Sequence, residues 1–89
     1  MKRYEYTITD AVRETLTVFP KDCDFHFYEF VSACRRRLKV NGSHANPYDG
    51  SIQRIMRMFR KEFNLVCVSR NKSIYRLLYD ERELERYVH

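Results

Sequence analysis

Two stretches of this 89-residue sequence place apolar side chains at the spacing of a helix, and they restrict the fold more than any other feature. In the first stretch the positions i, i+3, i+4, i+7 and i+11 are Phe27, Phe30, Val31, Cys34 and Leu38. In the second stretch the same spacing gives Ile52, Ile55, Met56, Phe59 and Phe63. Each such stripe must be buried against another element. The chain therefore predicts two amphipathic helices that pack in one core.

The ends of these two helices carry signals of their own. The first begins at about His26, and its last turn holds cations that suit a helix C-terminus, Arg35, Arg36 and Arg37. The cluster "VNGSHANP" then predicts a loop. For the second helix, Asn46 is a preferred N-cap, Pro47 suits the first helical position, and Asn64 can close the helix in a left-handed conformation. The sequence thus predicts a helix across residues 46–63.

A further helix is expected near the start of the chain. Thr9 is expected to cap it, with Asp10 in its first turn, and Pro20 ends it. Its apolar positions follow helical spacing at Val12, Leu16 and Phe19. Residues 3–8 alternate and predict a short strand or an extended arm, and residues 22–25 read as a connector.

The last third of the chain changes pattern. "LVCVS" and "SIYRLL" are β-branched and apolar, and they flank a polar, basic tip of Arg70, Asn71 and Lys72, which predicts a hairpin. "DERELERYV" begins like a capping box and predicts a helical tail over residues 79–89. We expect one α+β, mainly helical domain over residues 1–89, with its core at about 9–78.

Charge is distributed unevenly along the chain. The net charge is +5, but residues 35–76 carry eleven Lys and Arg against two acids, Asp49 and Glu62. The remainder carries six bases and ten acids. A basic middle between acidic ends is typical of a face that binds a polyanion. The alternative is a basic surface that only keeps the protein in solution.

Several function classes are disfavoured by the composition. The first 19 residues are too charged for a signal peptide, and no apolar run approaches the length of a membrane span. Three cysteines, an odd number, indicate reduced thiols in the cytoplasm. Cys23-x-x-His26 has no second ligand pair at zinc spacing, and no catalytic or cofactor motif is present. We therefore expect no enzyme, metal or cofactor.

The order helix, helix, loop, helix, hairpin resembles a winged helix-turn-helix domain of the small bacterial, phage or mobile-element type. The resemblance covers residues 25–77, with residues 9–19 as a candidate for the first helix, and is carried by "FHFYEFV", "YDGSIQRIMRMFRKEF" and "LVCV…SIYRLL". It implies a three-helix core with a β-hairpin wing, a third helix that enters the major groove of double-stranded DNA, and a role such as transcription regulation. The long loop before the third helix departs from the tight turn of the family.

The resemblance also implies which residues touch DNA. Candidates for the groove are Tyr48, Ser51, Gln53, Arg54 and Arg57, with Gln53 suited to adenine and the arginines to guanine. Candidates for phosphates are Arg36, Arg37, Lys39, Arg70 and Lys72. Two interpretations without DNA stay open. The cationic face of the third helix is then only solvated, and the run Arg35–Arg37 only stabilises the C-terminus of its own helix.

A second functional hypothesis is a winged-helix adaptor or inhibitor that binds a protein partner without reading DNA. It is motivated by the many aromatic residues and by the tail, where the apolar side chains without an assigned partner are Leu84, Tyr87 and Val88. The two hypotheses combine if the tail pairs two copies, since many DNA-reading proteins of this kind are homodimers.

Overall fold

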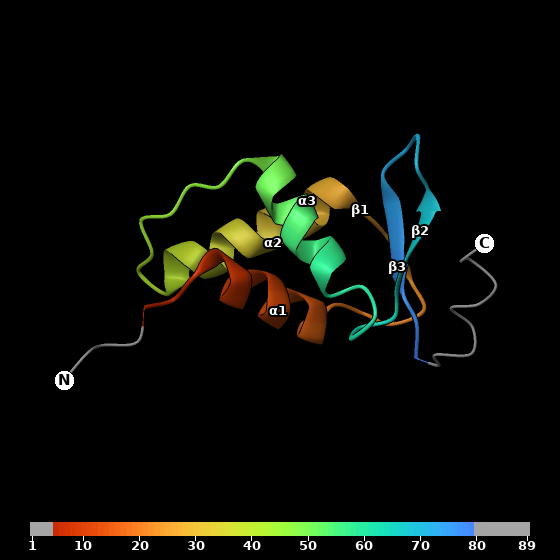
Figure 1. Ribbon diagram of the computed structural model, residues 1–89, viewed down its shortest axis with the longest axis horizontal. Helices are drawn as coiled ribbons and strands as arrows, with labels where there is room; N and C mark the ends of the chain where they lie inside the picture. Colours follow the sequence, from red (N-terminus) through yellow and green to blue (C-terminus); the bar gives the residue numbers. More distant parts are fainter. Residues whose placement is uncertain (1–4, 80–89) are drawn as a thin grey trace.

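The computed structural model of the protein describes residues 5–79. Six elements follow one another in this range: α1 (Ile8–Val18), β1 (Asp24–His26), α2 (Phe27–Val40), α3 (Asp49–Met58), β2 (Leu65–Ser69) and β3 (Ile74–Leu77). The three helices gather on one side, and the hairpin of β2 and β3 stands beside them (Figure 1). The predicted α+β class is confirmed. The predicted tail helix and its residues Leu84, Tyr87 and Val88 lie outside the described residues.

The three strands form one antiparallel sheet in the order β1-β3-β2. The two hairpin strands agree with the sequence prediction, whereas β1 corrects it, since residues 22–25 were expected to be a connector. Phe25 lies opposite Tyr75 across the β1–β3 pair, and Cys67 lies opposite Tyr75 on the other side. A strand of three residues is too short to show alternation, and its partner lies about fifty residues further along the chain. The strand β1 therefore forms because it pairs with β3, and not because of its local β-propensity.

The start of α1 differs from the prediction by two residues. Thr7, not Thr9, is the N-cap, because Thr7 and Asp10 form a capping box. The Thr7 hydroxyl accepts from the Asp10 backbone N–H at 3.1 Å, and the Asp10 carboxylate accepts from the Thr7 N–H at 2.8 Å. Only Thr7 has an acid three residues later, which the reciprocal bond requires. Residues 5–7 precede the helix without regular secondary structure.

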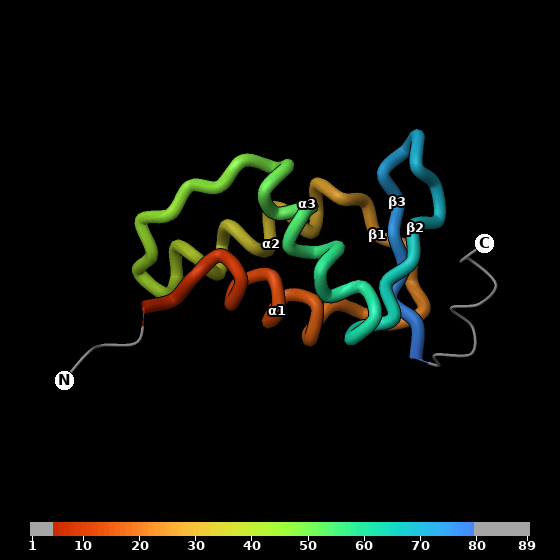
Figure 2. Tube along the Cα trace, in the orientation of Figure 1, coloured from red at the N-terminus to blue at the C-terminus, as the bar shows by residue number. Residues whose placement is uncertain are grey.

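Helix α3 is shorter than predicted at both ends. It begins at Asp49 after an N-cap at Tyr48, so Asn46 and Pro47 belong to the connection that precedes it. That connection, residues 41–48, brings the chain back along the helices from the far end of α2 (Figure 2). After Met58 the chain continues in turns as far as Asn64, which adopts the left-handed φ of 53°. The predicted left-handed Asn64 is confirmed, but it ends the turns and not the helix.

The core is centred on a cluster of aromatic rings. The ring of Phe30 on α2 is fully buried and lies 5.4 Å from that of Phe19 and 6.0 Å from that of Phe25. Phe25 also stacks on Tyr75 of β3 at 6.2 Å. Since these residues come from the end of α1, from β1, α2 and β3, the cluster joins the helices to the sheet. Around it pack Val12, Leu16, Val31, Cys34, Ile52, Met56, Leu65 and Leu77.

Candidate nucleic-acid interface

Helix α3 has one buried and one exposed face. Ile52 and Met56, four residues apart, are fully buried in the core. Gly50, Arg54 and Arg57 are exposed, and their spacing of four and three residues places them along one line of the helix surface. The packing of Ile52 and Met56 therefore directs the two arginines away from the protein.

The other groove candidates on α3 are less accessible. Tyr48 is 84 % exposed, whereas Ser51 and Gln53 are half-buried. The Gln53 side-chain amide donates to the Tyr75 hydroxyl at 3.0 Å, which ties α3 to the central strand β3. A glutamine held in this way is not free to present its amide group to adenine. The structure thus assigns Gln53 a contact within the fold that sequence reasoning missed.

The negative charge at the start of α3 is neutralised within the protein. Arg35 of α2 donates to the Asp49 carboxylate at 2.7 Å and to the Pro47 carbonyl oxygen at 3.1 Å. One guanidinium therefore fixes both the end of the connection and the first turn of α3. Asp49 enters the basic region as half of an ion pair and not as an isolated anion.

Ion pairs divide the cations of residues 35–76 into two groups. Three are paired with acids: Arg35 with Asp49, Arg37 with Glu14, and Arg76 with Asp24. The remaining eight are exposed and have no carboxylate within 4.0 Å in the part of the chain that the structure describes. These eight are Arg36, Lys39, Arg54, Arg57, Arg60, Lys61, Arg70 and Lys72.

The proposed phosphate contacts do not all lie together. The hairpin tip is anchored at the start of α2, where the Phe27 N–H donates to the Ser73 carbonyl oxygen at 2.8 Å. Arg36 and Lys39 lie nine and twelve residues further along α2, about 14 and 18 Å at the helical rise. The end of α2 and the hairpin occupy opposite ends of the molecule (Figure 1). The other exposed candidates, Arg54 and Arg57 on α3 and Arg70 and Lys72 at the hairpin tip, belong to two elements that the Gln53–Tyr75 hydrogen bond joins, and we call these four residues the basic face.

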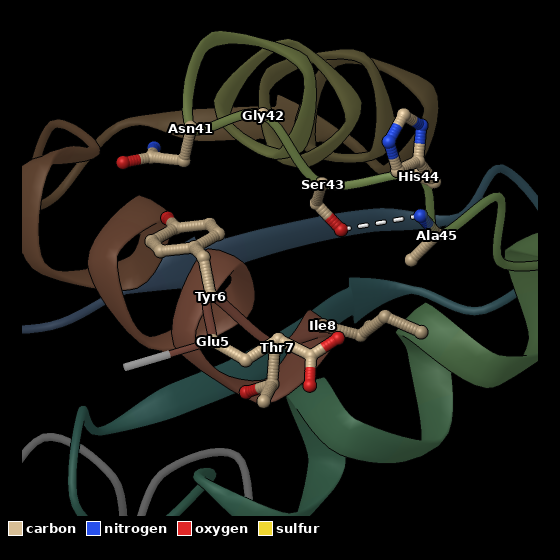
Figure 3. A pocket seen from close by; sticks show the side chains of 9 residues that line it. All are labelled: Glu5, Tyr6, Thr7, Ile8, Asn41, Gly42, Ser43, His44 and Ala45. Carbon is tan, nitrogen blue, oxygen red and sulfur yellow. Dashed lines mark hydrogen bonds between the residues drawn. The ribbon is translucent and has the colours of Figure 1, made fainter. Parts of the chain in front are cut away.

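A hollow lies at the other end, between residues 5–8 and the start of the α2–α3 connection (Figure 3). Two residues of the α2–α3 connection that line it bond within the protein. The Asn41 amide donates to the Arg37 carbonyl oxygen at 2.8 Å, and the Ala45 N–H donates to the Ser43 hydroxyl at 3.1 Å. These contacts stabilise the connection.

Two described groups have strongly perturbed acidity. Burial, together with a hydrogen bond to Glu14, raises the pKa of the Tyr6 hydroxyl well above its usual range. Burial raises the pKa of the Cys34 thiol to about 11. Neither group belongs to the basic face.

The thiols are expected to react in two classes. Cys23 and Cys67 are exposed, whereas Cys34 is buried and stays protonated at neutral pH. Because the thiolate is the nucleophile, we expect 5,5′-dithiobis(2-nitrobenzoate) at pH 8 to modify two thiols at least about 100-fold faster than the third. Denaturant should equalise the rates, and Cys34→Ala should remove only the slow phase. Equal rates for all three thiols in the folded protein would contradict the packing of α2.

No three His, Cys, Asp or Glu side chains among residues 5–79 are grouped to hold a metal ion. None of the described helices is long and apolar enough to cross a membrane.

No protein-family model, curated protein or solved structure matches this chain.

Proposed function

We propose that the protein binds double-stranded DNA, with α3 in the major groove and the β2–β3 tip against the backbone or the minor groove. The observation that carries this proposal is the position of Arg54 and Arg57 on the outer face of α3, opposite the buried Ile52 and Met56. Neither arginine has an acidic partner among the described residues. Two unneutralised guanidinium groups on one exposed helix face suit the guanine edge and the phosphates beside it.

We also propose that the described residues form a winged helix-turn-helix. Three features support this assignment: the three-helix core, the hairpin that follows α3, and the Gln53–Tyr75 hydrogen bond that holds α3 against the hairpin. The connection of residues 41–48 is longer than the turn of a tight helix-turn-helix unit. Arg35 fixes the end of this long connection to α3, since its guanidinium donates to the Pro47 carbonyl oxygen and to the Asp49 carboxylate.

The candidate phosphate contacts are not expected to contribute equally to DNA binding. Arg70 and Lys72 at the hairpin tip are exposed and suit phosphates. Arg37 lies 3.9 Å from the Glu14 carboxylate, so we expect it to contribute less. Arg36 and Lys39 reach only DNA that extends past the far end of α2. In this proposal the protein is a small DNA-binding regulator. It acts in the compartment that holds the DNA, which agrees with the expected cytoplasmic location.

The test is fluorescence anisotropy of the 89-residue protein on a labelled mixed-sequence duplex across a salt series. If the four cations of the basic face each meet a phosphate, the slope of log affinity against log salt is about −3 to −4. Affinity should then fall on the order of 100-fold between about 50 and 200 mM salt. An absence of binding at about 50 mM salt, or an affinity that does not change with salt concentration, would refute the proposal.

The alternative is a winged-helix module that binds a protein partner, and its tail residues lie outside the described range. Sedimentation of the full chain and of a chain ending at Leu78 separates the two ideas. Association lost with the tail, in a protein that does not bind duplex, would favour the interaction module. A dimer that binds duplex would join both ideas in one homodimeric regulator.

A further inference from the structure

Met58 is an apolar side chain on the polar face of α3. It is 74 % exposed, although Ile52 and Met56 of the same helix are fully buried. It is the last residue of α3 and lies four residues after Arg54, so it is a neighbour of that arginine on the helix surface. Its position removes it from the apolar stripe that packs on the core.

The surroundings of Met58 define the contact it can make. The two arginines of the outer face of α3, Arg54 and Arg57, provide hydrogen-bond donors for acceptors on base edges and phosphates, whereas a thioether provides no donor. The apolar group that a base pair offers in the major groove is the 5-methyl group of a pyrimidine. Methionine has three rotatable bonds and a polarizable sulfur, so it can adapt to a methyl group at the floor of the groove.

We propose that Met58 is a specificity-determining residue that contacts the 5-methyl group of thymine or 5-methylcytosine next to the bases read by Arg54 and Arg57. This inference rests on the proposed function, because it requires α3 in the major groove. It adds a preference for methylated pyrimidines that the cationic residues cannot supply. Removal of one methyl group from water predicts an affinity about three- to fourfold higher for the methylated duplex.

The experiment compares duplexes that differ only in this methyl group. Anisotropy competition with the full chain uses alternating dA-dT against dA-dU, and alternating dG-dC against the same polymer with 5-methylcytosine. Both pairs keep the Watson–Crick hydrogen bonds and the backbone charge. We expect the methylated member of each pair to bind about three- to fourfold tighter. Met58→Gln should bring both ratios close to one while duplex binding persists.

Val40→Gln is the matched control, because Val40 is 79 % exposed but lies at the end of α2, away from the basic face. This variant should keep both ratios. The inference is overturned by equal affinities in the wild-type protein, by ratios that survive Met58→Gln, or by a preference in only one pair, which would report duplex shape. Binding without a methyl preference refutes this inference and leaves the proposed function intact. A failure to bind any duplex at low salt refutes both.

Discussion

The double variant Arg54→Ala/Arg57→Ala is expected to bind duplex DNA at least about thirtyfold more weakly than the wild-type protein. Both side chains are exposed on the outer face of α3, and the described residues give neither a carboxylate partner. A bidentate arginine–guanine contact is worth about 1–3 kcal/mol, so loss of two costs at least about 2 kcal/mol. Anisotropy at fixed salt measures the affinity, and thermal unfolding should show a midpoint close to that of the wild type, because truncation of exposed side chains does not disturb the core.

Arg36→Ala/Lys39→Ala is the matched control for this experiment. It also removes two exposed cations that have no carboxylate partner among residues 5–79 and lowers the net charge by the same amount, but from the far end of α2. Both double variants lose the same long-range attraction for a polyanion, so the difference between them isolates direct contact by α3. We expect the control to lose less than about fivefold. Equal losses in the two variants would mean that the protein responds to total charge and that α3 has no special position on the duplex.

The elements that the sequence predicts well are those whose signal is local. The stripe of Phe30, Val31, Cys34 and Leu38 lies within one helix, and all four side chains are buried. The hairpin likewise has two apolar segments on either side of a short polar tip, and its strands begin and end close to the predicted bounds. In these regions propensity, periodicity and tertiary packing favour the same structure.

The differences arise where distant residues decide the local structure. The strand at Phe25 exists because β3 pairs with it, and no feature of residues 22–25 indicates a partner so far along the chain. Asn46 and Pro47 are good residues for a helix start, yet the helix begins later. The Arg35 guanidinium holds the Pro47 carbonyl oxygen and the Asp49 carboxylate, and this tertiary contact overrides the preference of the two residues.

The candidate site shows the same division. Helical spacing alone directs Arg54 and Arg57 outward once Ile52 and Met56 are buried, so their exposure could be predicted. The position of Gln53 could not, because its bond to Tyr75 joins residues 22 apart in the sequence. The sequence signal for that role is its position directly after Ile52 of the apolar stripe. The separation of Arg36 and Lys39 from the hairpin also depends on how α2 lies against the sheet.

Phe30→Ala is expected to lower the free energy of unfolding by about 3–5 kcal/mol, the usual cost of truncating a buried phenylalanine. Phe30 is fully buried, and its ring contacts Phe19 from the end of α1 and Phe25 from β1. Its loss leaves a cavity where the helices meet the sheet. A domain of this size is stable by only about 5–15 kcal/mol, so the variant loses much of its stability. Urea unfolding followed by circular dichroism measures the change.

Two further variants make this prediction decisive. Phe30→Leu keeps most of the side-chain volume and should cost less than Phe30→Ala, so it gives a measurable transition even if the alanine variant does not fold. Tyr48→Ala removes an aromatic ring that is 84 % exposed, and it should change the free energy of unfolding by less than about 0.5 kcal/mol. A similar cost at Phe30 and Tyr48 would contradict the aromatic cluster as the junction of helices and sheet. Because Ile52 and Met56 of α3 pack in the same core cluster, the contradiction would also remove the basis for a single basic face.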